Sequence, residues 1–522
     1  LVYNYNKIMP MNKIHILTTW ALAMLLSLVF TSCIDDDTTE GNVSSLPSLT
    51  IKGNDATTMP TYNFDLGEDI VIKPELGYTG DESQLTYKWQ MGTYTNGQKG
   101  ELKEVSTERD LKMKVKVGGS YYFHFTVTDG KVGQSMDYKV NLNRIFEEGY
   151  LLTSFDSDGK GNLTFIKIPT PEETAAGKKN VPIEHCLELM NEDVSEAELV
   201  KAVSGSVNLW DGKTYSVLTR ILVSTKDECY FLDPNNFTVL TEIKYADLYP
   251  GFQASEFMPD AYTPYAYDKN MKKFAHLNLK YMFPYEYTYF KGGESDDYIL
   301  CKYRLYGSEY SRTFYMDYTH NQVSIFSAYA SIFGLDTFFP NPGNLLNGQK
   351  LITAFCNGDG STVYVMAKGN VAGSINLWTN SNSYYEINED EFTSQSFIPT
   401  SETAVPDQGA RFVYSSKYDR YYYSLGNSIY VYLNSNQFTL PNKNQFAVQY
   451  GADEEVTFMD INLSTDELYV ATYNKTSKRG SFYIYDCKDV RTDNSSAVKP
   501  KKEYKDCCGK ITYLMYKPSI QS

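Results

Sequence analysis

The residues that could carry out catalysis are few and widely spaced in this sequence. Beyond residue 32 it contains the histidines His124, His185, His276 and His320. Their spacing forms no HExxH or HxxH metal-binding pair. No Gly-x-Ser-x-Gly nucleophile motif occurs, and no glycine loop ends in the Gly-Lys-Ser/Thr of a phosphate-binding loop. We therefore expect a non-catalytic protein with no cofactor and no metal.

A pair of acidic side chains is the one catalytic arrangement that the sequence leaves open. Two carboxylates can hydrolyse a glycosidic bond and can come from distant segments of a chain. The sequence has 64 acidic residues, so it does not identify such a pair. Asp156-Ser-Asp158-Gly-Lys160 is similar to the start of a calcium loop, but Lys160 stands where a third oxygen ligand belongs. The same residues predict a hairpin turn between 151–155 and 163–168, which we favour.

Cys33 is the cysteine with the most defined chemical context. Lys13 precedes a mostly hydrophobic run over 14–30, and Thr31-Ser32-Cys33 follows it. This order resembles a bacterial lipoprotein signal, in which the chain is cleaved before the cysteine and its thiol is lipidated. The alternative is a membrane-spanning helix, for which a run of about 17 residues is short. We expect residues 1–32 to be a signal peptide, with a start that is over-extended before Met11.

An acidic run behind the cysteine indicates the destination of the chain. Asp35, Asp36 and Asp37 resemble the export tag that places lipoproteins of Bacteroidota on the outer face of the outer membrane. The polar residues of 33–46 predict a flexible tether with a reach of about 45 Å. We expect a chain that is lipid-anchored in the outer membrane and faces the cell exterior.

The overall composition limits the remaining possibilities. The formal net charge of −16 disfavours nucleic acid as a partner. After Cys33 the other cysteines include no CxxC spacing, which makes a disulfide framework improbable. Cys487, Cys507 and Cys508 are the group in which a bridge could form, and the sequence leaves that open. The 46 tyrosines indicate β structure first and a binding surface second.

Residues 47–145 predict a β-sandwich, because short stretches of alternating hydrophobicity are separated by Gly, Asp and Asn turns. The predicted strands are 69–72, 85–89, 111–117, 121–129 and 136–142. Leu85-Thr-Tyr-Lys-Trp89 and Gly119 to Gly130 resemble the PKD fold, an immunoglobulin-like module. The resemblance implies that Trp89 is the buried tryptophan of the sandwich and that the module is a rigid stalk.

Residues 150–518 predict a second all-β domain after a hinge at 146–149. Arg411 to Tyr432 and Glu455 to Asp486 each give three strands with tight turns, similar to a β-propeller blade. Similar starts recur near Tyr150, Val217, Tyr262, Tyr298, Leu351, Phe412 and Val456.

This recurrence predicts seven blades, and two stacked sandwiches are the alternative. We expect Lys510 to Tyr516 to pair with the first blade and close the ring. The hydrophobic spacing in 193–203 is helical and predicts an inserted helix.

An aromatic segment over 245–290 is longer than a blade requires. Its tyrosines, stiffened by two prolines, could form a surface for a ligand or a partner protein, or could pack one face of a strand. A second aromatic loop surrounds Phe338-Phe339-Pro340. The residues predicted for this surface are Tyr262, Tyr265, Tyr285, Tyr287, Tyr289, Phe338 and Phe339.

The order of signal, PKD-like module and propeller resembles the PKD-like family of Bacteroidota surface lipoproteins. The resemblance implies a non-catalytic accessory protein that associates with a SusC/SusD-like TonB-dependent importer and neighbouring surface lipoproteins during nutrient uptake. The ligand class stays open between peptide and glycan. Only Trp89, Trp210 and Trp378 follow Cys33, which leaves little indole for sugar stacking and favours oligopeptides. A glycan-binding lipoprotein or a propeller glycoside hydrolase is the alternative.

Overall fold

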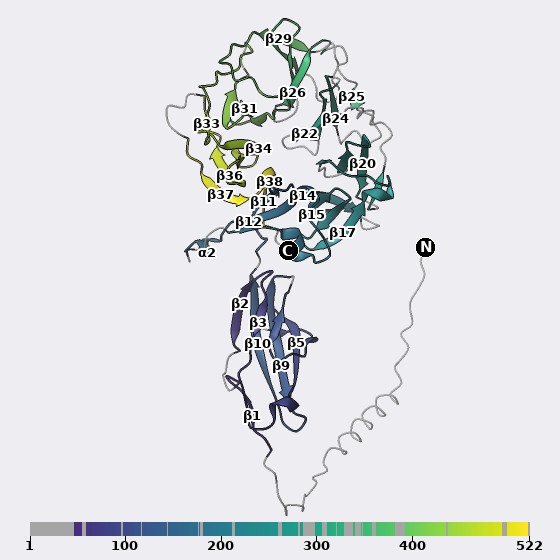
Figure 1. Ribbon diagram of the computed structural model, residues 1–522, viewed down its shortest axis with the longest axis vertical. Coiled ribbons are helices and arrows are strands. Elements are labelled where there is room, and N and C mark those ends of the chain that lie inside the picture. Colours follow the sequence, from purple (N-terminus) through teal and green to yellow (C-terminus); the bar gives the residue numbers. More distant parts are fainter. Residues whose placement is uncertain are drawn as a thin grey trace, which may run out of the picture.

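A computed structural model gives the architecture of the chain (Figure 1). Its described residues are 46–54, 59–95, 98–115, 117–143, 145–175, 177, 181–210, 215–258, 264–279, 282–285, 298–304, 311–319, 321–327, 338–339, 346, 348–357, 362–381, 392–434, 437–492 and 498–519. Within these ranges the structure is almost entirely β. No helix in them combines the length and the hydrophobicity needed to cross a membrane.

The first ten strands form a β-sandwich, called the module below. Its larger, six-stranded sheet has the order β2-β10-β9-β5-β6, with β7 also paired to β5, and the pairs β1-β4 and β3-β8 pack against it. The elements are β1 (Leu49–Ile51), β2 (Thr61–Asp65), β3 (Ile70–Ile72), β4 (Leu76–Tyr78), η1 (Glu82–Gln84), β5 (Thr86–Thr95), β6 (Gln98–Lys99), β7 (Lys103–Ser106), β8 (Leu111–Met113), β9 (Gly119–Thr128) and β10 (Gly133–Asn143).

The core of the module surrounds Trp89, as predicted. Its side chain is fully buried against Phe125, with ring centroids 4.5 Å apart. Its indole Nε1 donates a hydrogen bond to the carbonyl oxygen of Glu108 at 3.0 Å, which satisfies the one polar atom of the ring. The predicted strands from 69 to 142 correspond to β3, β5, β8, β9 and β10.

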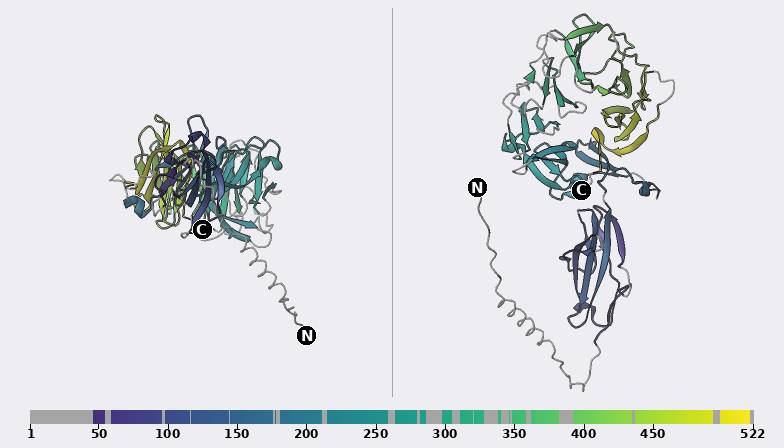
Figure 2. Two further views of the ribbon diagram at one scale, coloured as in Figure 1. Left: turned by 90° about the horizontal axis from the view of Figure 1, so that it is seen from below. Right: turned by 180° about the vertical axis from the view of Figure 1, so that it is seen from behind.

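Seven four-stranded antiparallel sheets follow in the described part of the chain, and Figures 1 and 2 show them arranged as a ring. They are the blades of a β-propeller, which confirms the predicted fold and blade number. Blades one to four contain β11 (Gly149–Phe155), β12 (Gly161–Lys167) and β13 (Pro182–Ile183); β14 (Leu199–Trp210), β15 (Tyr215–Thr225), β16 (Glu228–Leu232) and β17 (Val239–Lys244); β18 (Glu256–Met258), β19 (Tyr265–Asp268), β20 (Lys273–Asn278) and β21 (Phe283–Tyr285); and β22 (Tyr298–Arg304), β23 (Ser311–Asp317), β24 (Gln322–Ser327) and β25 (Phe338–Phe339).

Blades five to seven repeat the same order. They contain β26 (Lys350–Cys356), β27 (Val363–Lys368), β28 (Ile375–Asn380) and β29 (Thr393–Phe397); β30 (Val413–Ser415), β31 (Arg420–Leu425), β32 (Ser428–Tyr432) and β33 (Val448–Gln449); and β34 (Glu454–Asn462), β35 (Glu467–Asn474), β36 (Arg479–Asp486) and β37 (Lys502–Cys508). The short helices of the ring are α2 (Pro171–Ala175), α3 (Cys186–Met190) and η2 (Tyr245–Asp247).

The last strand, β38 (Lys510–Lys517), completes the first blade. It pairs with β11 from Gly149 opposite Lys517 to Phe155 opposite Lys510, so the two ends of the propeller sequence share one sheet. The predicted closure of the ring by Lys510 to Tyr516 is confirmed. Closure removes the exposed sheet edges that an open array would have.

The hydrophobic core of the ring lies between neighbouring blades. One cluster joins Phe355 and Tyr364 of blade five to Phe412, Tyr421 and Tyr423 of blade six. Other clusters join blades six and seven, and blades seven and one. Blades six and seven therefore pack against a neighbour on both faces of their sheets, so many of their strands are apolar on both sides.

The helix predicted over 193–203 is wrong. The helix of this region is α3, at 186–190, and β14 begins at Leu199. Leu199, Ala202 and Val203 are buried because an inner strand packs against two blades, and burial on both faces removes the alternation that marks a strand. The blade start at Val217 is also wrong, because that residue lies in β15, the second strand of its blade.

The module and the ring meet in a packed junction. Leu66 of the module shares a hydrophobic cluster with Ile145, Phe146 and the α3 residues Leu187 and Met190. The ring of Phe146 is fully buried and stacks on Phe237 with centroids 4.1 Å apart.

Lys517 holds the segment that links the two parts. Its buried Nζ donates to the carbonyl oxygens of Phe146 at 2.7 Å and Glu147 at 2.6 Å. The segment predicted as a hinge at 146–149 is therefore packed and hydrogen-bonded in this structure.

Candidate functional site

The predicted aromatic surface is only partly within the described residues. Tyr265 is 1% exposed, with its ring centroid 5.1 Å from that of His276. Its prediction as a surface residue is wrong, because β19 is a middle strand of blade three and both faces are covered. The backbone of Tyr285 pairs with His276 at the outer strand β21. Tyr262, Tyr287 and Tyr289 lie outside the described residues.

The structure describes only two residues of the second aromatic loop, and the anchor sequence lies outside the described residues. The backbones of Phe338 and Phe339 form β25, the outer strand of blade four, opposite Phe326 and Ile325. Cys33 and the acidic residues Asp35, Asp36 and Asp37 lie outside the described part of the chain. Their lipidation and export roles stay predictions.

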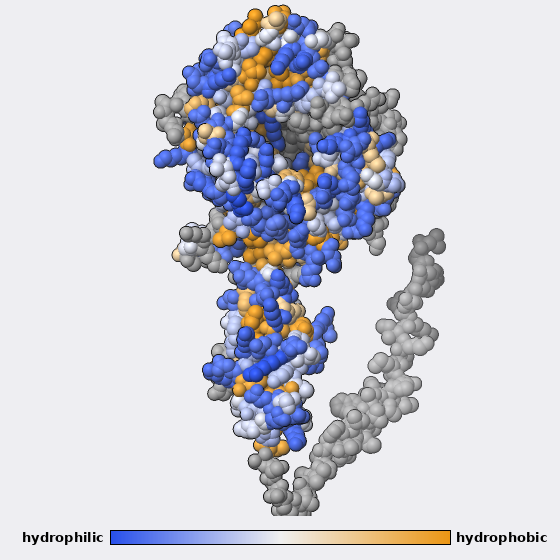
Figure 3. All heavy atoms as spheres, viewed as in Figure 1, coloured by the Kyte–Doolittle hydropathy of each residue, from blue (hydrophilic) through white to orange (hydrophobic). Residues whose placement is uncertain are grey.

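The centre of the ring brings together residues that the sequence analysis did not connect. The inner strands are β14, β22, β26, β30, β34 and β38, together with β18, and several of them surround the centre in Figure 1. Figure 3 shows the face of the ring hollowed near this centre. Five residues on or next to the inner strands, called the central cluster, contact one another across four consecutive blades. They are Lys201, Arg411, Phe458, Asp460 and Tyr513.

The contacts of the central cluster form an unbroken arc. The Nζ of Lys201 lies 5.4 Å from the ring centroid of Tyr513, and the Tyr513 and Phe458 rings meet edge to face at 5.3 Å. The guanidinium of Arg411 lies 5.0 Å from the centroid of Phe458. Its Nη2 is 3.0 Å from Oδ2 of Asp460. Arg411 and Asp460 keep about a third of their side-chain area exposed, at 33% and 38%.

Neighbouring strands explain why distant residues meet here. Asp460 and Phe458 lie on β34, Tyr513 on β38 and Lys201 on β14, the inner strands of blades seven, one and two. Arg411 immediately precedes β30 of blade six. Burial raises the pKa of Tyr513 well above its usual range, and Asp460 adds to that effect. Tyr513 is therefore neutral at physiological pH. The arrangement gathers two cations, one carboxylate and one phenol on or next to neighbouring inner strands.

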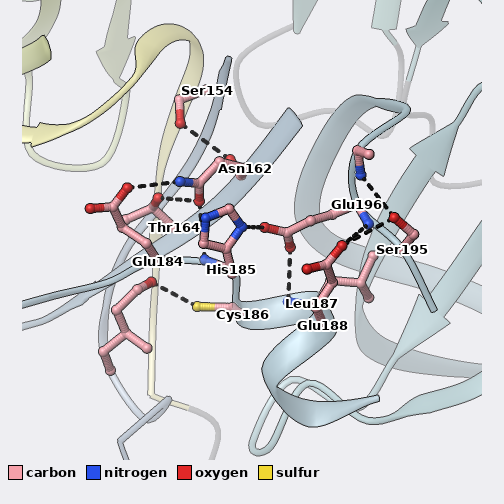
Figure 4. Close-up of polar contacts among 12 residues, drawn as sticks. Ser154, Asn162, Thr164, Glu184, His185, Cys186, Leu187, Glu188, Ser195 and Glu196 are labelled. Carbon is pink, nitrogen blue, oxygen red and sulfur yellow. Dashed lines mark hydrogen bonds and ion pairs between the residues drawn. The ribbon is translucent and has the colours of Figure 1, made fainter. Parts of the chain in front are cut away.

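A second polar group, the rim network, lies where blades seven, one and two meet (Figure 4). His185 Nδ1 is 2.6 Å from Oε1 of Glu196. Asn162 accepts from the backbone N–H of His185 at 3.1 Å and donates to Glu184 at 2.8 Å. Glu184 in turn pairs with Arg479 of blade seven at 2.9 Å.

The environment of Glu196 sets its protonation. The residue is 1% exposed, whereas the His185 side chain is 58% exposed. Burial raises the pKa of Glu196 to about 7, opposed by the attraction and hydrogen bond of His185. His185 also has a left-handed backbone with φ of 59°, a conformation that costs free energy and is held by its neighbours.

A histidine backed by a buried carboxylate can act as a general base. A hydrolase would also need a nucleophile next to the imidazole. The hydroxyl of Ser195 donates to Glu188, and the thiol of Cys186 donates to the carbonyl oxygen of Ile183. No hydrogen bond among the described residues joins His185 to a hydroxyl or thiol. The rim network therefore serves best as a structural link between blades.

Two further sequence predictions can be compared with the structure. Asp156 Oδ1 accepts from the backbone N–H of Asp158 and of Lys160, both at 2.9 Å, in the turn that joins β11 to β12. The hairpin turn is confirmed. The described part of the chain contains no group of three or more potential metal ligands.

The cysteines near the C-terminus are buried free thiols. Cys487, Cys507 and Cys508 form no disulfide, although the sulfur atoms of Cys507 and Cys508 are 3.9 Å apart. Cys229 is fully buried, as its place in a hydrophobic stretch predicts. These side chains belong to the packing of the ring.

Comparisons with known proteins support the fold. No protein-family model matches the sequence, and no curated protein matches it significantly. A solved quinoprotein alcohol dehydrogenase-like protein from Bacteroides thetaiotaomicron is similar over 91% of this chain and 100% of its own, with a TM-score of 0.50 and 17% identity. At that identity the similarity shows the fold alone.

Two other solved structures are more distant matches. KlAtg21, in a complex with the coiled coil of AgAtg16, covers 68% of this chain and 99% of its own length at a TM-score of 0.39 and 11% identity. Hydrazine synthase from Kuenenia stuttgartiensis covers 64% and 95%, with a TM-score of 0.33 and 12% identity. Scores this low carry no functional argument.

Proposed function

We propose that this chain is a non-catalytic lipoprotein of the outer membrane that displays a seven-bladed propeller outside the cell. In this role it associates with a SusC/SusD-like TonB-dependent importer and helps to capture its nutrient, which we take to be oligopeptides. The lipid on Cys33 anchors the chain, the module acts as a stalk, and the ring binds the nutrient.

The observation that carries this proposal is the packed junction at one end of the elongated module. The ring joins the end where β10 finishes, and the first described residues lie at the opposite end (Figure 1). The 11 residues of β10 span about 36 Å, so the module separates the ring from the anchored end of the chain by about that length. A stalk of this kind presents a ligand-binding face to a neighbouring transporter.

The junction is rigid enough for such a stalk. Leu189 of α3 packs against Gly67 of the module, where an added Cβ would lie 3.3 Å from the leucine Cδ2. Phe146 and Lys517 fix the linking segment from the ring side. A free hinge would let the ring rotate, whereas these contacts give it one orientation.

The tryptophans support a peptide nutrient over a glycan. Trp89 is fully buried in the module. Trp378 is half-buried in blade five, with Nε1 at 3.3 Å from Oε1 of Gln349. The buried Trp89 therefore offers no open indole face on which a sugar ring could stack.

Protease treatment of intact cells tests the surface location. We expect the ring to be degraded while a periplasmic marker protein in the same cells stays intact. Protection of the ring would contradict the proposal. The Cys33→Ala variant should leave the membrane fraction, because no lipid can be attached.

Affinity purification of the native chain from detergent-solubilised membranes tests the partner. We expect a TonB-dependent importer and its surface lipoproteins to co-purify. Recovery of the chain alone, under conditions that preserve other importer complexes, would contradict the association.

A further inference from the structure

Two adjacent thiols lie in contact at the point where the ring closes. Cys507 and Cys508 end β37, and Gly509 joins them to the closing strand β38. Their sulfur atoms are 3.9 Å apart, and the two residues are 2% and 0% exposed. Both belong to the hydrophobic cluster between blades seven and one. The other described cysteines lie in four other clusters, so each of these two thiols has the other as its neighbour.

An irregularity of β37 brings the two thiols together. Adjacent residues of a regular strand point to opposite faces, which keeps their side chains apart. Tyr504 pairs with Phe482 of β36. Cys508 pairs with Gly480, so four residue steps on β37 match two on β36. The two residues after the buried Tyr504 are exposed, and Cys507 and Cys508 are then buried one after the other. The strand thus turns both thiols into one cluster.

Asp506 lies within this irregularity and is held by β36. Its backbone is left-handed, with φ of 51°, a conformation that costs free energy in a residue other than glycine. Its N–H donates to Oγ of Ser481 at 2.9 Å. Its carbonyl oxygen accepts from Nε and Nη2 of Arg479 at 3.2 and 3.0 Å. The backbone that places the thiols in contact is therefore fixed by contacts with the neighbouring strand.

We propose that Cys507 and Cys508 are a redox site, at which a small-molecule disulfide oxidises the two thiols to a bridge between neighbouring residues. The thiolate of one cysteine attacks a sulfur of the oxidant, forms a mixed disulfide and releases one thiol. The second cysteine attacks the sulfur of the first and releases the other thiol. The two cysteines lose two electrons and two protons, and the oxidant takes them up and leaves as two thiols.

The bridge should be easily reversed. Both thiols are free in this structure, and side-chain rotation must bring the sulfur atoms from 3.9 Å to a bonding distance of about 2 Å. Adjacent Cα atoms are about 3.8 Å apart across a trans peptide bond, below the range of about 4.4–6.8 Å usual for bridged cysteines. A bridge between neighbours is therefore strained, and strained bridges are easily reduced by thiols. Because Cys508 leads directly into Gly509, oxidation acts where the ring closes.

Burial controls how fast this site reacts. The hydrogen bond with Cys508 and burial raise the pKa of the Cys507 thiol well above its usual range, so little thiolate forms while the ring is closed. The oxidant reaches the pair when β38 separates locally from its neighbours, and we expect a low concentration of urea to speed the reaction. The site does not depend on the proposed function, although export would take these thiols out of the reducing cytoplasm.

Peptide mass spectrometry of the full chain tests the proposal. Trypsin cleaves after Lys505 and Lys510, so both cysteines fall in one peptide, 506–510. The folded chain is incubated with oxidised glutathione at pH 8, with and without urea below the unfolding transition. It is then quenched with acid, denatured and alkylated. We expect peptide 506–510 to carry no alkyl group and to be two hydrogen atoms lighter than the reduced peptide. Dithiothreitol added before alkylation should give two alkyl groups instead.

Cys487 is the matched control, because it is also a buried free thiol but lies in a different cluster. Its tryptic peptide, 480–488, should carry one alkyl group after every treatment. The Cys508→Ala variant leaves Cys507 without a neighbouring thiol, and its peptide should carry one alkyl group or one glutathione. A melting temperature identifies a variant that has unfolded, and in that case the measurement on the native chain decides.

Three outcomes would overturn the redox site. Two alkyl groups on peptide 506–510 after oxidation in both buffers would mean that the thiols only pack against each other. A glutathione adduct that never proceeds to the bridge would mean that the two sulfur atoms cannot join. A cross-link between peptides 480–488 and 506–510 would assign the oxidation to a different pair of cysteines. Equal rates with and without urea would contradict the role of local opening in giving the oxidant access.

Discussion

At the scale of single residues, Glu196 connects the stability of the ring to pH. Its pKa of about 7 lies above the ordinary glutamate value of 4.5, because the buried carboxylate is costly to ionise. Between these two values the folded chain binds more protons than the unfolded chain, so stability falls as pH rises through this window. The Glu196→Gln variant has no carboxylate to ionise and should lose this decline.

Melting temperatures at pH 5 and pH 8 measure the effect. We expect the native chain to melt at a lower temperature at pH 8, and Glu196→Gln to show a smaller difference between the two. Glu503→Gln is the control, because Glu503 is exposed and should keep the native profile. A Glu196→Gln profile that matches the native one would contradict the assignment.

The tyrosines illustrate how much a residue type reveals about its own environment. Their abundance predicts β structure, and Tyr421, Tyr422 and Tyr423 in β31 are indeed almost fully buried on both faces of one strand. The same abundance does not show which tyrosines reach the surface. Tyr265 is predicted to be exposed and is buried, because a tyrosine ring packs well in a core and β19 is covered on both faces.

At the scale of elements, Gly509 controls how the ring closes. It joins β37 to β38, and an added Cβ would lie 2.2 Å from the carbonyl oxygen of Phe155. Backbone atoms cannot move aside easily, so Gly509→Ala should destabilise the ring by about 1–3 kcal/mol. Gly205→Ala is the matched control, because a Cβ at Gly205 on β14 has no atom within 4 Å. Chemical denaturation compares the two, and equal midpoints would contradict this account.

A second prediction at the scale of elements concerns the hydrogen bonds of Lys517 at the junction between the module and the ring. Lys517→Met removes the donor that satisfies the Phe146 and Glu147 carbonyl oxygens, and a buried carbonyl without a partner costs about 1–3 kcal/mol. We expect the endoproteinase that cleaves after glutamate to cut at Glu147 and Glu148 faster than in the native chain. Lys505→Met should be cut at the native rate, and so would Lys517→Met if the contact were unimportant.

The pH dependence of the same residue provides an independent check. Burial lowers the pKa of Lys517 from 10.5 to about 8. The unfolded chain therefore binds more protons between these values, and the lysine makes stability rise with pH across this window. Lys517→Met should lack that rise, as measured by denaturation at pH 8 and pH 10. A rise equal to that of the native chain would show that the buried ammonium does not titrate in this range.

Most elements could be predicted from the sequence, for a physical reason that also explains the failures. Repeated hairpins with tight turns identify blades, and a lone strand at the C-terminus predicts closure, because sheet edges need partners. An inner strand such as β14 is buried on two sides and loses its alternation, so the pattern of its residues 199–203 resembles that of a helix. The central cluster could not be predicted at all. Arg411 and Lys201 are 210 positions apart, and only the closed ring brings them to one centre.

At the scale of the whole molecule, the ring is stable only if it closes. β38 pairs with β11 along the full length of that strand, and Tyr513, Leu514 and Met515 belong to the clusters between blades. A chain that ends at Cys508 lacks this strand, exposes the edge of β11 and loses the Lys517 contact with the junction. Exposed edges of this kind promote pairing between chains.

We therefore expect the chain that ends at Cys508 to aggregate on size-exclusion chromatography and to lose the cooperative unfolding of the ring. A chain that ends at Pro518 keeps β38 and should behave as the native protein does. Because neighbouring blades share their hydrophobic clusters, removal of one inner strand weakens both of its neighbours and the loss spreads beyond the first blade. A monomeric shortened chain with a native melting temperature would mean that each blade is stable on its own, which the shared clusters contradict.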